Sequence, residues 1–458
     1  MKVNEEYTVK IDKISNLGLG ITKIDGLVVF VENACPEDEL LIKITKLNKN
    51  YANGEIKTII KPSSHRVEPF CPMQKVCGAC QLQFIDYEYQ LKIKQEIVKD
   101  TLHAIGNIDI KVPFPVKSPE IKEYRCKVQY PVSQTKVSKR ILAGYFKPKS
   151  HEIVNIKYCP IQPAICDKII DFVRETATQF DITGYNEKTH SGELRHVVIR
   201  YSKYNKKCLV TLVVNTNKSF EKISDLSKLL FENFDEVSGV CINFNNKKSN
   251  LIMTDKTKLE AGKDYIEEKL TDKVFKFGAN SFFQVNPKSA ENIFEYVKEY
   301  INNNFTNPTV FDAYAGVTTF GIVVSDVCEK VVSVEECKEA VEWAKKTVND
   351  NKISNIELHN MDAEKFFEKE LNTTGRKFNI TILDPPRKGS TEKTLDNVLK
   401  LTTDKIIYVS CNPATLARDL KYLTGKGAKL ESIQPFDMFC HTYHIENVAI
   451  IDLKDVNK

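Results

Sequence analysis

The chain has 458 residues, which is too long for one ordinary hydrophobic core and predicts two or three domains. Its 66 Lys and Arg residues only slightly exceed its 61 Asp and Glu residues, so the net charge of +5 permits nucleic-acid binding without requiring it. Because the sequence holds neither an apolar stretch long enough to cross a bilayer nor a signal-peptide core, membrane and secreted classes are excluded and we expect a cytoplasmic protein.

Residues 1–61 alternate short β-rich runs with turn signals, which predicts five short strands. So many strands in so few residues favour a small barrel, and an OB-like, oligonucleotide-binding barrel is the natural candidate. A plain barrel without a ligand is the alternative. If RNA lies across the barrel, six lysines are candidate phosphate contacts: Lys10, Lys13, Lys23, Lys43, Lys46 and Lys49.

A group of cysteines follows the linker that begins at residue 62. In a reducing compartment, clustered cysteines are better read as metal ligands or catalytic groups than as disulfides. Cys71, Cys77 and Cys80, at spacings of six and three, can converge on one metal centre, and Cys159 is the candidate fourth ligand. Four thiolates suit zinc or a 4Fe-4S cluster, and the residues alone leave both open.

The region up to about residue 265 is predicted to be a mixed α+β domain, with a helix from residue 88 to about 104 and strand-rich sequence after it. Cations accompany aromatic residues in segments 124–127, 136–140 and 192–200. Such a surface suits single-stranded RNA, whose bases stack and whose phosphates pair with cations. A solvated basic face fits the composition equally well.

Residues 266–458 alternate strands and helices, which predicts a doubly wound, Rossmann-like α/β sheet. Asp312, near the end of the first strand, and Glu335, which ends the second, match a nucleoside-binding crevice in which the second carboxylate binds the ribose. The first turn lacks the later glycines of G-x-G-x-x-G, which disfavours a dinucleotide and favours S-adenosylmethionine. The expected strands begin near residues 309, 330, 355, 378, 405, 429 and 446.

Cys411 is the candidate nucleophile, because it ends a buried strand just before a helix predicted to begin near Pro413. A helix N-terminus lowers the pKa of a nearby thiol, so we expect a reactive thiolate that faces the crevice. Standing alone, the residue would be read as an inert buried cysteine. Two carboxylates are expected beside it, Asp384, which two prolines aim into the crevice, and Glu446.

A thiol and a base over an S-adenosylmethionine crevice fit the methylation of uracil C5. Thiolate addition to C6 makes C5 nucleophilic, and after methyl transfer a base removes the C5 proton and the thiol is eliminated. We assign Cys411 as nucleophile and Glu446 as base, with His444 and Asp384 orienting the base or the cofactor. The uracil must be flipped out or presented in a loop. Arg387, which stands where amino-group methyltransferases have an aromatic residue, disfavours that class.

These motifs together resemble the RNA uracil-5-methyltransferase family over nearly the whole chain. The resemblance implies a TRAM barrel over residues 1–61, a central iron-sulfur and RNA-binding domain over residues 62–265 and a methyltransferase domain over residues 266–458. It also implies a 4Fe-4S cluster and favours 23S ribosomal RNA as the substrate. It assigns Cys411 and Glu446 to catalysis, Cys71, Cys77, Cys80 and Cys159 to the cluster, and Gln284, Tyr314, Thr319, Glu335, Asp362 and Asp384 to the cofactor.

Four residues depart from the family pattern: Thr318 replaces a glycine, Ala315 a cysteine, Cys126 an asparagine and Cys440 a proline. We expect Thr318 to crowd the methionine end of the cofactor, Ala315 to be harmless, and Cys126 and Cys440 to lie near the RNA or active-site surface. We expect a monomer with no membrane partner. A transfer RNA methyltransferase and a catalytically inactive iron-sulfur RNA-binding protein stay open as alternatives.

Overall fold

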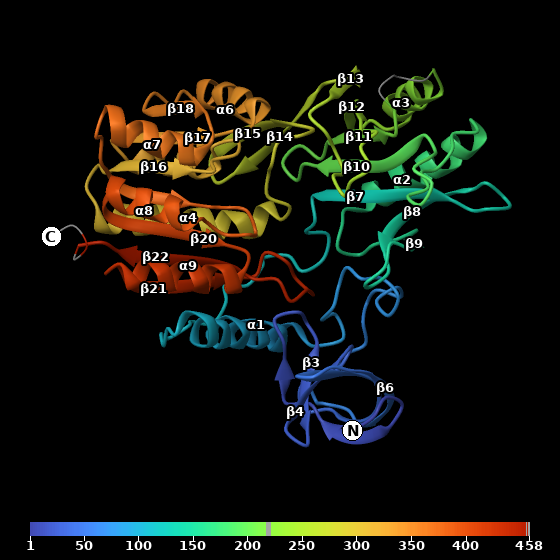
Figure 1. Cartoon of the computed structure of the whole chain (residues 1–458). Coiled ribbons are helices and arrows are strands. Elements are labelled where there is room, and N and C mark those ends of the chain that lie inside the picture. Colours follow the sequence, from blue (N-terminus) through green and yellow to red (C-terminus); the bar gives the residue numbers. More distant parts are fainter. Residues whose placement is uncertain (217–220, 455, 457–458) are drawn as a thin grey trace.

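The structure, a computed structural model, describes residues 1–216, 221–454 and 456. The chain forms three lobes, each built on a sheet of its own (Figure 1). The N-terminal lobe is the small curved sheet at the bottom of Figure 1, the central lobe lies above it at the right, and the C-terminal lobe at the left carries most of the helices. Among the described residues, no helix is long and apolar enough to span a membrane.

The N-terminal lobe is a curved six-stranded sheet with strand order β1-β5-β6-β4-β3-β2. Five strands are predicted, and the sixth is a two-residue strand, too short to show an alternating pattern. Apolar residues such as Val29, Leu40 and Ile42 are fully buried inside the curve. The strands are β1 (Glu6–Lys10), β2 (Lys13–Ile14), β3 (Gly20–Ile24), β4 (Leu27–Val31), β5 (Glu39–Leu47) and β6 (Tyr51–Lys61).

The central lobe is a mixed seven-stranded sheet with order β13-β12-β11-β10-β7-β8-β9, and two helices pack on it. A hairpin of two further strands, β14 (Tyr265–Leu270) and β15 (Lys273–Gly278), leads to the C-terminal lobe. The elements are β7 (Lys127–Gln134), β8 (Ile141–Phe146), β9 (Ile153–Asn155), α2 (Ala164–Gln179), β10 (Leu194–Tyr201), β11 (Cys208–Val214), α3 (Glu221–Asn233), β12 (Val237–Phe244) and β13 (Thr257–Gly262).

The structure corrects the expected RNA-binding surface over residues 192–200. Arg195 is 4% exposed and donates to three backbone carbonyls, while Arg200 is 3% exposed and donates to Ala279 O at 3.0 Å. Both guanidinium groups therefore satisfy buried carbonyls instead of phosphates. Nearly every residue of β10 is buried, on both faces of the strand, and the local density of cations does not reveal this burial.

The C-terminal lobe is a seven-stranded sheet with order β18-β17-β16-β19-β20-β22-β21. Strands β16 to β20 pair in parallel, and β22 is antiparallel to both of its neighbours. The elements are α4 (Pro287–Asn304), β16 (Thr309–Ala313), α5 (Thr319–Val324), β17 (Lys330–Glu335), α6 (Lys338–Asp350), β18 (Ile356–Asn360), α7 (Ala363–Thr373), β19 (Phe378–Leu383), α8 (Glu392–Leu401), β20 (Thr402–Ser410), α9 (Pro413–Gly425), β21 (Lys429–Phe436) and β22 (Glu446–Asp452).

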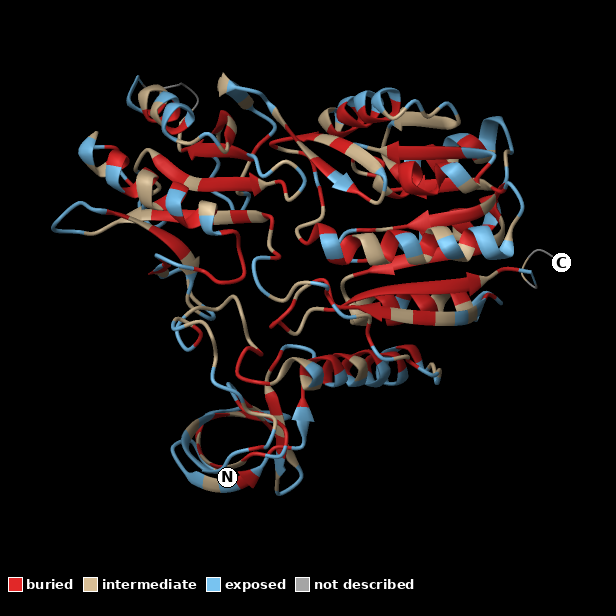
Figure 2. Ribbon diagram, turned by 180° about the vertical axis from the view of Figure 1, so that it is seen from behind, coloured by how far each residue is buried: buried red, intermediate tan, exposed pale blue. Residues whose placement is uncertain are grey.

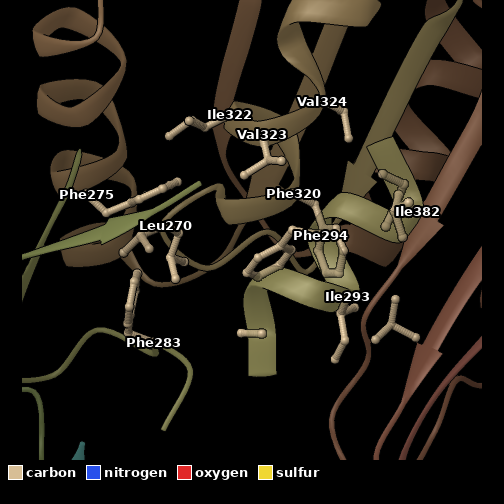
Figure 3. Packing of buried hydrophobic residues seen from close by; sticks show 14 of the residues in the cluster. Leu270, Phe275, Phe283, Ile293, Phe294, Phe320, Ile322, Val323, Val324 and Ile382 are labelled. Carbon is tan, nitrogen blue, oxygen red and sulfur yellow. The ribbon is translucent and has the colours of Figure 1, made fainter. Parts of the chain in front are cut away.

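Both faces of this sheet are buried, as its nearly continuous apolar strands require (Figure 2). Val310 packs into the apolar group on one face and its neighbour Phe311 into the group on the other. Figure 3 shows part of the first group, in which Phe294 of α4 meets Phe320 of α5 edge to face, with ring centroids 4.7 Å apart. This packing fixes the strand ends that carry the site.

Helix α1 (Tyr87–Thr101) lies between the N-terminal sheet and the C-terminal lobe (Figure 1). The Asp86 side chain caps it by accepting from Tyr89 N, and a π-helical turn, Leu102–Gly106, ends it. The helix and this turn pack against α9. Its buried face includes Lys94, an unusual residue to bury.

Candidate active site

A cavity of about 1040 Å³ lies at the carboxyl edge of the C-terminal sheet. Most of the predicted residues there stand at or just after a strand end, because parallel strands all end at the same edge, whereas Gln284 and His444 lie in loops. Antiparallel pairing of β22 with β20 brings the start of β22 to that edge as well, with Asn447 opposite Ser410. The cavity is lined by Gln284, Tyr314, Glu335, Asp362, Asp384, Cys411, His444 and Glu446, whereas Thr319 is not among its lining residues.

Backbone hydrogen bonds hold the carboxylates on the side of the cavity where cofactor residues are predicted. Glu335 accepts from Gly316 N at 2.9 Å and from Cys337 N at 2.8 Å, which holds its carboxylate at the end of β17. Asp362 caps α7 by accepting from Lys365 N at 3.0 Å. Two carboxylates fixed at adjacent strand ends are suited to accept hydrogen bonds from the ribose and the base of a nucleoside.

The turn after β16 depends on a buried carboxylate. Asp312 accepts from Gly321 N at 3.0 Å and Ser333 Oγ at 3.2 Å, and burial raises its pKa to about 7. Thr318 adopts φ +61°, a left-handed conformation that glycine takes most easily. This conformation explains why the family pattern has a glycine at this position. A Cβ on Gly321 would lie 2.7 Å from the Thr318 methyl group. Thr318 thus packs against Gly321 and does not line the cavity.

The chemical side is built from two interlocked turns. Asn412, which follows Cys411 and caps α9, donates through Nδ2 to Arg387 O at 3.1 Å, and Thr415 Oγ1 donates to the same carbonyl at 3.3 Å. Gly389 has φ +74°, and a Cβ there would lie 2.6 Å from the Asp419 carboxylate. Arg387 is therefore held beside the thiol, although its side chain is exposed in the cavity wall.

Two carboxyl groups, those of the buried Glu446 and the partly exposed Asp384, lie close enough to this thiol to raise its pKa. Burial raises the pKa of Asp384 to about 7 and that of Glu446 well above its usual value, and the nearby Asp384 raises the Glu446 pKa further. Arg387 acts in the opposite direction on Glu446. Burial lowers the His444 pKa to about 4, so this imidazole is neutral at physiological pH. Closely spaced acids with raised pKa values are suited to proton transfer near neutrality.

The expected low pKa of Cys411 is wrong for the substrate-free protein. Burial raises the Cys411 pKa to about 11, with Glu446 and Asp384 adding to the rise. Arg387 lowers this pKa by its charge and by a hydrogen bond. Desolvation of the thiol and the two nearby acids thus raise the Cys411 pKa even though a helix N-terminus follows it. Arg387 is the cation that favours the thiolate.

Arg387→Leu is expected to make Cys411 less reactive. Because a pKa of about 11 leaves few thiolates at neutral pH, iodoacetamide alkylation of the wild-type thiol should rise about tenfold per pH unit between pH 6 and 9. Loss of the arginine charge should lower that rate about tenfold or more at each pH. Mass spectrometry of the Cys411 peptide measures it, and equal rates in both proteins would contradict the role of Arg387.

The four cysteines predicted to bind metal gather in one place. Every pair among Cys71, Cys77, Cys80 and Cys159 is close enough for one thiolate to raise the pKa of another, and burial raises all four pKa values, that of Cys159 to about 12. Within the described ranges, however, no three His, Cys, Asp or Glu side chains form a group that could hold a metal ion.

Two departures from the family pattern are buried instead of lying at a surface. Cys126 is 5% exposed, and Cys440 is fully buried with its thiol 3.6 Å from Glu120 O. Neither lines the cavity. The expectation that they would touch RNA or the active-site surface is therefore wrong, because each side chain points into packed interior.

The cavity also has an arm that the sequence did not reveal. It extends from the active site past the cysteine segment to the β8–β9 turn, and its wall includes Arg125 and Phe146 together with two lysines of that turn. Of the residues that line the arm, Tyr124 and Arg125 belong to a segment predicted to bind RNA. The cation-rich sequence Lys147-Pro148-Lys149 beside an aromatic residue was the available signal. The lining residues of the arm are Gly78, Ala79, Gln81, Tyr124, Arg125, Tyr145, Phe146, Lys147, Pro148 and Lys149.

A doubly wound sheet of this order, with a nucleoside crevice at its carboxyl edge and no dinucleotide glycine pattern, defines an S-adenosylmethionine-dependent methyltransferase. The model of the tRNA (uracil-5-)-methyltransferase family matches residues 86–454, and the TRAM domain model matches residues 1–57. The chain belongs to this family and is an RNA (uracil-5-)-methyltransferase.

Similar proteins agree over the full length. A protein from Clostridium tetani, named as an uncharacterized RNA methyltransferase, is 37% identical over 451 residues, which are 98% of this chain and 97% of the relative. A protein of the same kind from Halalkalibacterium halodurans is 36% identical over 453 residues, with 99% and 98% covered. The Pyrococcus abyssi tRNA (uracil-54, C5)-methyltransferase, solved with S-adenosyl-L-homocysteine, has a TM-score of 0.76 at 26% identity, with 97% of this chain and 100% of that chain covered.

Proposed function

We propose that this enzyme methylates uracil C5 in 23S ribosomal RNA through a covalent adduct between Cys411 and C6. The observation that supports the mechanism is the convergence of one thiol, one arginine and two carboxyl groups on the cavity whose other side holds Glu335 and Asp362. The substrate proposal rests on the cysteine pattern, which resembles that of the ribosomal RNA branch of the family. The transfer RNA activity named for the Pyrococcus relative makes transfer RNA the second candidate.

In the proposed mechanism each site residue performs one part of the reaction. Cys411 Sγ, as thiolate, bonds to C6, and the electron pair of the C5–C6 double bond moves toward O4. S-adenosylmethionine, when bound, would supply an electrophilic methyl group, which C5 would take with the enolate electron pair while the pair of the methyl–sulfur bond stays on the sulfur. Glu446 then takes the C5 proton, the C–H electrons restore the double bond, and the C6–S bond breaks to release the thiolate. Gln284, Tyr314, Glu335, Asp362 and Asp384 are proposed to bind the cofactor, with Thr319 contributing from beyond the cavity wall.

The test of the substrate is the 5-methyluridine content of separated RNAs from a strain that lacks the gene. We expect loss from 23S ribosomal RNA alone, and the number of uridines lost gives the number of sites. Loss from transfer RNA alone would replace the ribosomal proposal with the alternative. Unchanged 5-methyluridine in all RNAs would reject both and favour an inactive RNA-binding protein.

We propose that the four cysteine thiols hold a 4Fe-4S cluster, as the family's cysteine pattern implies. The thiols gather closely enough for each pair to interact through the pKa, and in such a cluster each thiol binds a different iron. Gln83 gives a second reason: its Oε1 accepts from Cys71 N at 2.9 Å, while its buried Nε2 has no partner. A cluster sulfur beside Cys71 would accept from that amide. We propose a structural role, because Cys77, Cys80 and Cys159 share an apolar group with Cys440, a buried residue of the loop between β21 and β22.

Cys159→Ala is expected to lose the cluster. Protein purified without oxygen should fall from about four irons and four sulfides per chain to a minor fraction, with loss of the visible absorbance, because one iron loses its thiolate. Cys208→Ala, which removes a buried thiol of the central sheet, is the control. Wild-type protein that contains one zinc and no sulfide would reject the cluster.

The three lobes are proposed to act on one RNA. Residues 1–61, 62–265 and 266–458 would hold the RNA flank, the cluster and the reaction respectively. A second cavity of about 380 Å³ on the N-terminal sheet shares Lys149 with the arm of the main cavity, and Lys149 pairs with Glu32 of that sheet. Lys149 thus connects a cavity whose wall includes Phe30, Glu32 and Glu55 with the arm that leads to Cys411, and we propose that a single-stranded substrate follows this route.

A further inference from the structure

The loop between β21 and β22 ends at Glu446, yet residues from outside the C-terminal sheet fix its course. Five consecutive backbone carbonyls of this loop accept hydrogen bonds from five donors on other segments. The pairs are Ser289 Oγ to Asp437 O at 2.9 Å, Asn286 Nδ2 to Met438 O at 3.2 Å, Lys94 Nζ to Phe439 O at 3.0 Å, Tyr124 OH to Cys440 O at 2.9 Å and Leu82 N to His441 O at 2.8 Å.

One ion pair lies at the centre of these contacts. Lys94 Nζ donates to Asp437 Oδ1 at 2.6 Å, and both side chains are fully buried. Tyr87 OH donates to Asp437 Oδ2 at 2.9 Å and accepts from Ser118 N at 3.0 Å. Each charged group therefore has a charged partner and a further hydrogen bond, the arrangement that a buried pair needs.

The course of the β21–β22 loop matters because site residues lie both on it and next to it. The cavity is lined by four residues of the loop and its end: Phe439, Thr442, His444 and Glu446. Asn286, which donates to Met438 O of the loop, lies two residues after Gln284. A buried ion pair is weak evidence for stability, because apolar residues of similar volume often replace one without loss. The role that the contacts favour for the buried Lys94–Asp437 pair is therefore to fix the geometry of the β21–β22 loop.

We infer that Lys94 and Asp437 are positioning residues, which hold the β21–β22 loop so that Glu446 reaches the C5 proton of the uracil. The inference rests on the proposed adduct mechanism. It places the effect on proton removal, the step that follows bond formation by Cys411, because Cys411 directly follows β20 and is flanked by α9 and the Arg387 turn instead. Glu335 and Asp362, which are proposed to bind the cofactor, accept hydrogen bonds from backbone donors outside the loop.

The experiment uses the double variant Lys94→Met and Asp437→Leu in the full-length enzyme. Both charges are removed together, so no unpaired charge stays buried and folding should be kept, as the thermal midpoint reports. We expect kcat to fall about 100-fold, the cost of a misplaced catalytic group, while the Kd for S-adenosylmethionine stays within twofold. The methylated enzyme–RNA adduct should accumulate on denaturing gels.

Two further variants keep the test decisive. Tyr87→Phe removes one hydrogen bond to Asp437 and should accumulate the same adduct with about a tenfold loss of kcat, even if the double variant unfolds. Lys405→Met removes a buried cation paired with Asp452 at 2.8 Å at the far end of the same strands, and should leave the ratio of adduct to product unchanged. A folded double variant with wild-type turnover overturns the inference. Wild-type enzyme that forms no adduct overturns the proposed mechanism instead.

Discussion

Cys411→Ala is expected to abolish both methylation and the covalent enzyme–RNA adduct. Uracil C5 is too weak a nucleophile to take a methyl group unless a nucleophile adds to C6, and Cys411 is the only thiol among the residues that line the described cavity. Removal of a nucleophile costs on the order of 10⁶-fold in kcat, which places the variant below detection. Transfer of a radioactive methyl group to RNA and gel retention of 5-fluorouracil RNA measure the two effects.

The substitution should leave binding intact. Alanine at a half-buried cysteine removes one sulfur atom, so calorimetry should give wild-type affinity for S-adenosylmethionine. Cys328→Ala is the matched control, since this buried cysteine lies just before β17, at the opposite edge of the sheet. Normal turnover by Cys411→Ala would reject Cys411 as the nucleophile. Loss of cofactor binding would show that the substitution disturbs the structure of the site, and the lost turnover would then have that cause.

Glu446→Gln should trap the adduct. Addition and methylation precede removal of the C5 proton, so a glutamine that cannot accept this proton should stop the reaction after methyl transfer. Turnover is expected to fall by about 10²–10⁴-fold, the usual contribution of a general base. The methylated adduct should persist on denaturing gels with one methyl group per enzyme, in contrast to Cys411→Ala.

A second substitution on the same strand separates this effect from general damage. Asp452→Asn lies at the other end of β22, where Asp452 pairs with Lys405, and should lower stability slightly without trapped adduct. Free release of methylated RNA by Glu446→Gln would remove this residue from its role. The neutral neighbour His444 would then be the base to examine.

The sequence by itself determined the C-terminal lobe well, because local periodicity encodes burial. Continuous β-branched runs predicted strands buried on both faces, and the strands at residues 330–335 and 378–383 agree with β17 and β19. Pro413 marked the start of α9 just after Cys411, and the structure shows that Asn412 caps this helix. Strand ends at a common edge then brought Glu335, Asp384 and Cys411 together.

Only the tertiary structure decided the pKa values of the site residues and the contacts that hold the site in place. The Cys411 pKa depends on burial and on charges from other strands, so the helix start alone gave the wrong direction. The direction of Arg195 and Arg200 depends on sheet pairing, which local composition does not record. The Lys94–Asp437 pair joins positions 343 residues apart, and no local sequence pattern indicates a contact at that separation. Only folding of the whole chain brings the two charges together and out of water.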